Sequence, residues 1–364
     1  MKNLDRFRSV MHYVPCDHPP YMGEGPWPDT VERWNREGLA PGRSWTEALG
    51  VETFNIDHHG YRDGIYPLFE SRVIEETDEF RVVCDEYGCT TRNFKHSTSM
   101  PEWLEFPVTD RASFERLIAE HMDPRPAVRL PADWAARVCR FNHPDFDGLL
   151  LPPAGSFCAV LKSVMSVETM CLLFYDAPDL MRRFFDLQSD LCCWFLEKFF
   201  AEVQANVFCI GTGEDLAFKN GPFFSPAMFE EFFAPGYSRA VAIARRHGAE
   251  LFFMDTDGNF SILLPRLLEI GVNLFNPMEV AAGMDPVALR TKHGQALRMI
   301  GGVDKRIVAA GPDAIRAELR RLEPVVRAGG YCPKIDHSIS ADISWDNFRC
   351  YIDALRDLFG RLGR

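Results

Sequence analysis

Two aspartates at the end of an apolar segment form the sharpest chemical signal in the chain. In ELFFMDTDGN, Asp255 and Asp257 are separated by one residue, so an extended strand places both carboxylates on one side, and Gly258 lets the chain turn away after them. Two carboxylates placed in this way can share a proton, hold a cation or orient a substrate amine or hydroxyl. The alternative is that one of them, or Asn259, caps the next helix.

A titratable imidazole follows the last apolar segment of the same kind. GGYCPKIDHS ends in Asp336 and His337. Histidine is the usual general acid or base near neutral pH and the commonest metal ligand. We therefore expect Asp255, Asp257 and His337 to be the catalytic residues, and the same three to be the ligands of any bound divalent metal such as zinc.

Other polar residues that follow apolar segments are expected to bind the substrate. Lys305 and Arg306 can hold a carboxylate or phosphate, although a salt bridge from them to Glu279 or Asp215 is an equal alternative. Glu214 and Asp215 with Lys219 could instead form a buried ion pair that holds a loop. The complete set of expected substrate-binding residues is Asp57, Glu214, Asp215, Lys219, Asn276, Glu279, Lys305 and Arg306.

Composition and missing motifs narrow the class of protein. The net charge of −12 argues against a nucleic-acid partner, because such proteins carry a concentrated basic surface. The first residues lack the features of a secretory signal, and no uncharged run approaches the roughly 18 residues of a membrane span, so we expect a cytoplasmic protein without a membrane partner. The phosphate-binding GxxxxGK[ST], the nucleophile motif GxSxG and the dinucleotide motif GxGxxG are missing, which lowers the rank of phosphoryl and hydride transfer.

The elements that must position these residues repeat one pattern. Five apolar segments, each followed by an amphipathic helix, end near residues 214, 255, 276, 304 and 336. Three earlier candidates lie around residues 21–25, near Asp57 and near Ser156. Eight such units predict an α/β fold of the (β/α)8 TIM-barrel type, in which the strand ends converge on one mouth.

Two further features complete the expected organisation. Residues 70–96 alternate like an antiparallel ribbon with turns at Thr77-Asp78 and Tyr87-Gly88, which we interpret as part of a β-ribbon insertion after the second strand, spanning about residues 66–110. The helical stretch from Val167 to Val203 is expected to split at Ala177-Pro178. No linker is evident, so residues 1–364 are expected to form a single barrel domain.

From about Gly213 to Leu355 the sequence resembles the uroporphyrinogen decarboxylase superfamily, which includes the decarboxylase of haem biosynthesis and cobamide-dependent methyltransferases. The resemblance rests, in order, on GEDLAFKNGPFFSPAMFEEFFAP, MDTDGN, GVNLFNPMEVAAGMD, GGVDKR, GGYCPKIDHSI and SWDNF. The amino-terminal half fits more loosely, through PDTVERWNREG and STSMPEWLEFPV. The resemblance implies a (β/α)8 barrel with a deep mouth, and barrels of this superfamily often pair, which implies a homodimer.

Departures from the family pattern indicate the branch. Uroporphyrinogen decarboxylases carry paired arginines and a Gln-Ala-Gly-Arg-Tyr run that grips the carboxylates of the substrate, and no such run occurs in this sequence. Thiol-activating methyltransferases have a His-x-Cys pair after the fifth strand and a later Cys that together bind zinc. Asp255 and Asp257 stand at the first two of these positions, and His337 lies near the third, so an oxygen-rich site replaces the thiolate site.

The resemblance implies a methyltransferase that demethylates a small O- or N-methylated substrate and transfers the methyl group to a corrinoid carried by a partner protein. Asp255, Asp257 and His337 would bind and protonate the heteroatom, directly or through a metal, and Lys305 and Arg306 would hold an anionic part of the substrate. The first alternative is a decarboxylase of an acidic substrate that uses the same groups. The second is a binding protein for a corrinoid or small acid that has lost the chemistry.

Overall fold

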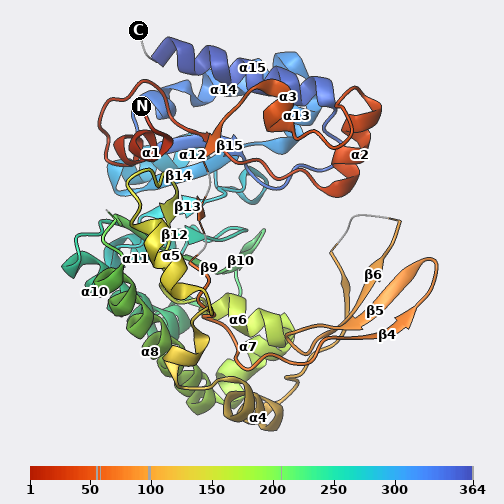
Figure 1. Ribbon diagram of the computed structural model, residues 1–364, viewed down its shortest axis with the longest axis vertical. Helices are drawn as coiled ribbons and strands as arrows, with labels where there is room; N and C mark the ends of the chain where they lie inside the picture. Colours follow the sequence, from red (N-terminus) through yellow and green to blue (C-terminus); the bar gives the residue numbers. More distant parts are fainter. Residues whose placement is uncertain (55, 58, 97–99, 206, 363–364) are drawn as a thin grey trace.

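Five parallel strands form a continuous sheet in the carboxyl-terminal half of the chain. The computed structural model (Figure 1) describes residues 1–54, 56–57, 59–96, 100–205 and 207–362. The sheet has the order β15, β14, β13, β12, β9, and its strands are β9 (Cys209–Gly213), β12 (Leu251–Asp255), β13 (Leu274–Asn276), β14 (Arg298–Val303) and β15 (Tyr331–Ile335). Most of their residues are buried, as expected for parallel strands that are covered on both faces.

The amino-terminal half adds two shorter parallel pairs. These are β1 (Tyr21–Met22) with β2 (Thr53–Phe54), and β3 (Ile56–Asp57) with β8 (Leu149–Leu150). The chain after β1 lies beside the end of β15, where the Ile339 amide donates to the Gly25 carbonyl at 2.9 Å, and the Ala154 amide after β8 donates to the Gly211 carbonyl of β9 at 2.9 Å. The parallel α/β architecture is therefore confirmed, and closure of all eight strands into one hydrogen-bonded barrel stays a prediction.

Helices follow the strands and cover the outside of the sheet (Figure 1). In the first half they are α1 (Asn3–Met11), α2 (Pro28–Arg36), α3 (Trp45–Leu49), α4 (Arg111–His121), α5 (Trp134–Phe141), α6 (Phe157–Val164), α7 (Val167–Asp176) and α8 (Pro178–Glu202). In the second half they are α9 (Pro226–Met228), α10 (Ala234–Arg246), α11 (Leu264–Ile270), α12 (Pro286–His293), α13 (Lys305–Ala310), α14 (Pro312–Arg327) and α15 (Trp345–Leu362). The expected division between α7 and α8 at Ala177-Pro178 is confirmed.

The helix that follows β11 (Gly221–Pro222) begins after Ser225 and contains one irregular turn. The Ser225 hydroxyl accepts a hydrogen bond from the Met228 amide, and Pro226 occupies the first turn, which are both favourable at a helix start. A π-helical segment, Phe229–Phe233, connects α9 to α10. It turns three phenylalanines, at positions 229, 232 and 233, into the core.

The antiparallel ribbon is confirmed as a small sheet of four strands, which projects from the body of the protein in Figure 1. Its strands, in spatial order, are β4 (Arg72–Glu76), β5 (Phe80–Cys84), β6 (Thr90–Phe94) and β7 (Glu102–Glu105). Every residue of β4 and β7 is exposed. Residues 97–99 of the expected insertion lie outside the described residues. A second, two-stranded hairpin, β10 (Ala217–Phe218) with β11 (Gly221–Pro222), follows β9.

A buried apolar cluster on the inner side of the strands supports a layer of polar side chains. The cluster consists of Phe7, Val10, Met11, Met22, Phe54, Leu149, Phe208, Cys209, Leu251, Phe253, Leu274, Ile300 and Cys332. Side chains on a strand alternate, so the residues two positions after Met22, Phe253, Leu274 and Cys332 lie on the same side as the cluster. These are Glu24, Asp255, Asn276 and Lys334, and they lie toward the carboxyl ends of the strands, the region that we call the mouth.

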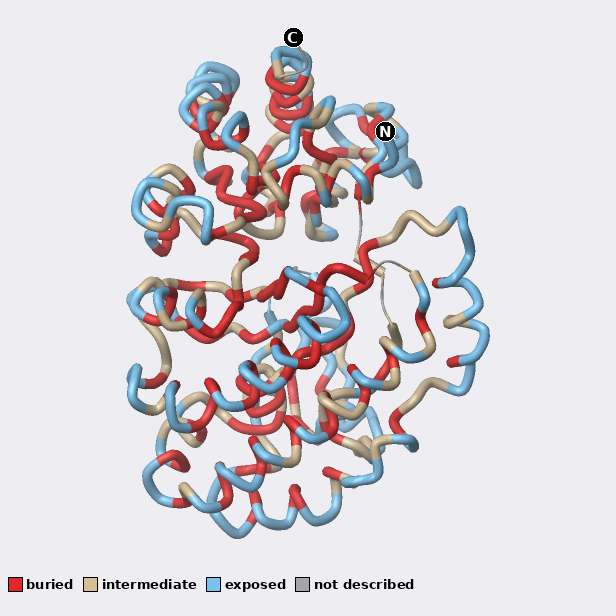
Figure 2. The backbone as a smooth tube through the Cα atoms, turned by 90° about the vertical axis from the view of Figure 1, so that its left-hand side faces the viewer, coloured by how far each residue is buried: buried red, intermediate tan, exposed pale blue. Residues whose placement is uncertain are grey.

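The last helix packs against the amino-terminal segment. Phe348 of α15 is fully buried, and its ring lies 4.5 Å from that of Trp34 in α2 and 5.2 Å from that of Trp45 in α3. The Trp34 indole also donates to the Ile343 carbonyl at 2.9 Å. Figure 2 shows how burial varies along the chain: buried segments lie toward the interior, and exposed segments lie at the periphery.

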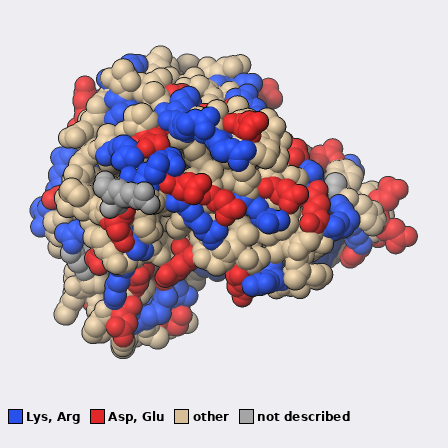
Figure 3. Space-filling model, turned by 90° about the horizontal axis from the view of Figure 1, so that it is seen from above, with Lys and Arg blue, Asp and Glu red and all other residues tan. Residues whose placement is uncertain are grey.

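The outer surface carries charges of both signs. On the face seen in Figure 3, Lys and Arg side chains are interspersed with Asp and Glu. Among the helices of the described residues, none combines the length and the apolar character that crossing a lipid bilayer requires.

Replacing Phe348 with alanine should strongly destabilise the fold, because it removes the contacts between α15 and the helices α2 and α3. We expect a loss of about 3–5 kcal/mol in the free energy of unfolding, measured by urea denaturation. Phe94→Ala is the matched control, since Phe94 is 48% exposed. It should change the stability by no more than about 0.5 kcal/mol, and equal losses in both variants would contradict this account of the packing.

Candidate active site

Asp257 and His337 meet at the mouth although 80 positions separate them in the sequence. His337 Nε2 lies 3.3 Å from Asp257 Oδ2, and the two side chains are 33% and 38% exposed. The hydrogen bond to Asp257 raises the pKa of His337 above its ordinary value, although burial opposes the shift. An imidazole that holds its proton more firmly than usual, and that a substrate can reach, is suited to act as a general acid.

Asp255 lies deeper than Asp257, at the end of β12. Its carboxyl group is hydrogen-bonded to Asn276 of the neighbouring strand β13. Burial, assisted by the negative charge of Asp257, raises the pKa of Asp255 to about 6, while Asn276 and Lys334 oppose the shift. Near neutral pH this group therefore exchanges a proton readily, as a shared acid and base requires.

Asp336 has a structural role beside His337. It is 1% exposed, and its two carboxylate oxygens accept hydrogen bonds from the Val280 amide at 2.9 Å and the Lys305 amide at 3.1 Å. Burial raises the pKa of Asp336 to about 6. The side chain thus joins the loop after β13 to the start of α13, and it fixes the backbone from which His337 projects.

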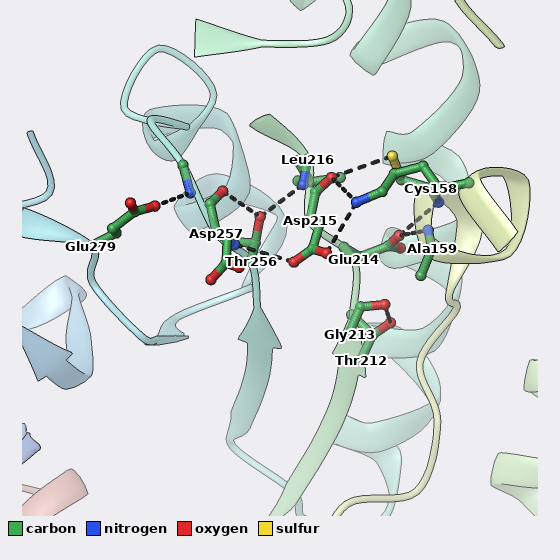
Figure 4. A network of polar contacts seen from close by, with 12 residues as sticks. Cys158, Ala159, Thr212, Gly213, Glu214, Asp215, Leu216, Thr256, Asp257 and Glu279 are labelled. Carbon is green, nitrogen blue, oxygen red and sulfur yellow. Dashed lines mark hydrogen bonds and ion pairs between the residues drawn. The ribbon is translucent and has the colours of Figure 1, made fainter. Parts of the chain in front are cut away.

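Glu214 caps α6, as Figure 4 shows. Its carboxylate accepts hydrogen bonds from the amides of Phe157 at 2.9 Å, Cys158 at 2.7 Å and Ala159 at 3.3 Å, and from the Tyr237 hydroxyl. Burial raises the pKa of Glu214 to about 7, against these hydrogen bonds. With its oxygens engaged in this way, Glu214 positions α6 and the end of β9, whereas its expected contact with substrate stays a prediction.

Asp215 pairs with a lysine that the sequence did not indicate. Lys162 of α6 lies 3.0 Å from Asp215 Oδ2, whereas Lys219 is exposed, so the alternative of an ion pair to Lys219 is wrong. Asp215 also accepts from the Asp257 amide at 3.3 Å, a contact drawn in Figure 4. The lysine that completes the pair is supplied by an earlier helix, and Asp215 in turn holds the backbone of Asp257.

Glu279 holds the turn after Asp257. Its Oε2 accepts from the Gly258 amide at 3.0 Å (Figure 4). Gly258 has φ +77°, and a Cβ there would lie 2.4 Å from the Ala217 carbonyl oxygen, so only glycine fits. The sharp turn expected from the sequence is therefore set by both a positive φ and a close backbone approach.

Two of the expected substrate-binding residues are engaged by ion pairs. Asp57 at the end of β3 receives two hydrogen bonds from Arg140 of α5, at 2.8 and 2.6 Å. Arg306 forms a similar forked contact with Asp304, at 2.9 and 2.6 Å, instead of the salt bridge to Glu279 or Asp215 that we considered. Lys305 lies close enough to His337 for its charge to oppose the protonation of the imidazole.

A cavity of about 230 Å³ opens beside Asp255. It is lined by Ile56, Asp57, His59, Asp63, Leu151, Pro153, Ser156, Gly211, Thr212, Gly213, Phe253 and Asp255. A larger cavity of about 420 Å³, lined by Leu149 and Phe208 among others, lies at the opposite ends of the strands. We assign the chemistry to the smaller cavity because it contains Asp255 and adjoins the polar layer of the mouth.

Two polar residues of the mouth, Asp63 and Lys334, were not identified as site residues from the sequence. Asp63 lines the cavity, accepts from the Ser156 hydroxyl at 2.8 Å and has its pKa raised by burial. Glu24 and Lys334 belong to the polar layer. Lys334 could have been found from the sequence, because it lies two positions after Cys332 in an apolar strand and therefore on the same side of that strand. For Asp63, in a loop, the sequence offered no such signal.

The described residues do not assemble a metal site. Among them, no group of three or more His, Cys, Asp and Glu side chains is arranged to hold a metal ion. Asp257 faces His337 and Asp255 faces Asn276. A site of Asp255, Asp257 and His337 for zinc or another divalent metal stays a prediction, and no chemical step below depends on it.

Comparisons with known proteins concern the family and the fold. The family described as uroporphyrinogen decarboxylase (URO-D) matches residues 148–358, more than half of the chain. A solved structure described as a methyltransferase from Methanosarcina mazei superposes with a TM-score of 0.61 at 14% sequence identity, over 99% of this chain and 99% of that one. At this identity the likeness concerns the fold. A search of curated proteins found no match.

Asp257→Asn should lower the pKa of His337, because it removes the hydrogen bond that contributes most to the upward shift. The measurement is an NMR titration of the His337 ring in the wild type and the variant. Asp145→Asn, which changes an exposed carboxylate, is the control and should leave the pKa of His337 unchanged. An unchanged His337 titration in Asp257→Asn would show that the two side chains are not in contact.

Glu24→Gln should flatten the dependence of stability on pH. Burial raises the pKa of Glu24 from 4.5 to about 7, so the folded state holds more protons than the unfolded state between these values. The contribution of Glu24 to stability is therefore complete below about pH 4.5 and is lost as pH rises through 7. Unfolding free energies measured across this range should fall less steeply with pH in Glu24→Gln than in the wild type, and Glu120→Gln, an exposed change, should keep the wild-type slope.

Proposed function

The chain belongs to the uroporphyrinogen decarboxylase family, and from that premise we propose that it is a methyltransferase, which demethylates a small O- or N-methylated substrate and passes the methyl group to a corrinoid carried by a partner protein. Members of the family are decarboxylases or methyltransferases. The single observation that carries the proposal is the contact between His337 and Asp257 at an accessible part of the mouth. A demethylase needs such a proton donor for its leaving group.

The side chains of the mouth can supply the proton that the leaving group needs. A reduced corrinoid, when bound, supplies the nucleophile that accepts the methyl group. As the bond between the methyl carbon and the heteroatom breaks, its electron pair stays on the oxygen or nitrogen, which takes a proton from His337 Nε2. Asp257 orients the imidazole of His337 and stabilises the imidazolium before the transfer.

The exposure of the donor pair fits a large methyl acceptor. Asp257 and His337 are 38% and 33% exposed, so a corrinoid on a second protein can approach the substrate bound beside them. Lys305, near His337, is available to an anionic group of the substrate, and Arg306 contributes only if it leaves Asp304. Closure of the strands into one barrel, the pairing of two chains and the cytoplasmic location belong to the same proposal.

Decarboxylation of an acidic substrate is the second candidate. The observation that favours it is Asp255, whose pKa is raised to about 6 by burial, in a cavity of about 230 Å³. A carboxylic acid that is partly protonated near neutral pH can deliver a proton to the carbon that loses carbon dioxide. Release of carbon dioxide separates this reaction from methyl transfer.

His337→Gln should lower the rate of methyl transfer by about 10²–10⁴-fold, because it removes the general acid. The assay mixes the purified protein with a chemically reduced corrinoid and a panel of methoxylated and N-methylated compounds, and follows methylation of the corrinoid by its absorbance. His143→Gln, a change of a largely exposed histidine, is the control and should retain the wild-type rate.

Two outcomes would contradict the proposal. If His337→Gln kept the full rate, His337 would not be the proton donor. If the wild-type protein released carbon dioxide from carboxylic acids and methylated no corrinoid with any donor, the second candidate would replace the first.

A further inference from the structure

We infer that Lys334 binds a carboxylate of the substrate, so that the substrate class is a methylated carboxylic acid. This inference rests on the proposed function and deepens it. Lys334 lies on β15, two positions after Cys332, which belongs to the inner apolar cluster. Alternation along the strand therefore directs the lysine to the inner side, toward the mouth.

The ammonium group of Lys334 has no hydrogen-bond or ion-pair partner in the part of the chain that the structure describes. The side chain is partly exposed. Its nitrogen is not among the fully buried polar atoms that lack a hydrogen-bond partner, so it is not sealed off from solvent. Its neighbour on β14 is Gly302, which has no side chain to offer it. A lysine that is partly buried and unpaired inside a polar layer has its positive charge available to an anion.

The groups around Lys334 complete a carboxylate site. Lys334 is close enough to Glu24 and Asp255 to influence both charges. Glu24 is 9% exposed; its Oε1 accepts from the Ile335 amide and the Tyr351 hydroxyl, each at 3.0 Å, and its Oε2 has no partner. Burial raises the pKa of Glu24 to about 7, so the protonated group can donate from Oε2 to a carboxylate that Lys334 holds.

The distance to the proton donor suits a compact substrate. Lys334 precedes His337 by three residues, so their Cα atoms are no more than about 11 Å apart. The site beside Lys334 also contains Asp255, which adjoins the cavity of about 230 Å³. A small acid can therefore place its carboxylate at Lys334 and its methylated heteroatom at His337 and Asp257.

The simplest rival is that Lys334 only neutralises Glu24 and Asp255. In that case the lysine would affect the stability of the fold and the charge of its neighbours, but it would not distinguish an acidic ligand from a neutral one of the same shape. Selectivity between such ligands is therefore the decisive readout.

The test measures binding to the full-length protein by calorimetry, without corrinoid and without turnover. The probes are 4-methoxybenzoate, methoxyacetate and N,N-dimethylglycine, each compared with its neutral amide. We expect the wild type to bind at least one acid tenfold or more tightly than its amide, and Lys334→Met to lose that preference while its affinity for the amide is unchanged. The retained amide affinity also shows that the variant is folded.

Two control variants sharpen the result. Lys292→Met removes an exposed lysine of α12 and should keep the preference for the acid. Lys305→Met removes the lysine whose charge acts on His337, and if it alone abolished the preference, Lys305 and not Lys334 would be the anchor.

The remaining outcomes also decide the question. Equal binding of every acid and its amide to the wild type, or no binding of any acid, would overturn the inference, as would an unchanged preference in Lys334→Met. Acid binding that depends on Lys334 in a protein that methylates no corrinoid would uphold the carboxylate site and refute the methyltransferase reaction, so the two failures are distinguishable.

Discussion

Carboxylates that accept hydrogen bonds from backbone amides hold the strand ends and their loops in place. Glu214 joins the end of β9 to the first turn of α6, Asp336 joins the loop after β13 to α13, and Glu24 joins the chain after β1 to β15. Each of these contacts pairs a backbone amide with an oxygen of a buried carboxyl group. An unsatisfied buried polar group costs about 1–3 kcal/mol, so the loops have little freedom to separate from these side chains, and the positions of the reactive groups follow from them.

The same constraint divides the acidic residues of the mouth into two kinds. Glu214 and Asp336 are buried and engaged by amides, so they act on the backbone. Asp257 instead keeps its carboxylate for His337, while its own amide is held by Asp215 and the next amide, of Gly258, by Glu279. The supporting carboxylates thus fix the main chain on both sides of the reactive one, which explains why a partly exposed pair can keep a defined geometry.

Much of the arrangement could be predicted from the sequence, because strand order and alternation follow from the apolar pattern. The rule that parallel strands end at one edge brought together Asp257 and His337, and the alternation of residues 70–96 predicted the ribbon. The partners of the ion pairs at the mouth could not be predicted in this way. Lys162 and Arg140 reach Asp215 and Asp57 from helices 53 and 83 positions away, and the rotation of a helix on the sheet is not encoded in any local pattern. Closure of the strands into one barrel, which the sequence also predicted, stays a prediction, since β1 is only two residues long.

The hydrogen bond between Glu24 and Ile335 spans 311 positions of the chain, and this has a consequence for biosynthesis. A chain that grows from its amino terminus exposes Glu24 long before the amide that it needs has been made. Until β15 leaves the ribosome, burial of this carboxyl group has no donor from Ile335 to offset its cost. The segment around β1, although it is synthesised first, therefore depends on the last strand of the sheet for a hydrogen bond that its buried carboxyl group needs.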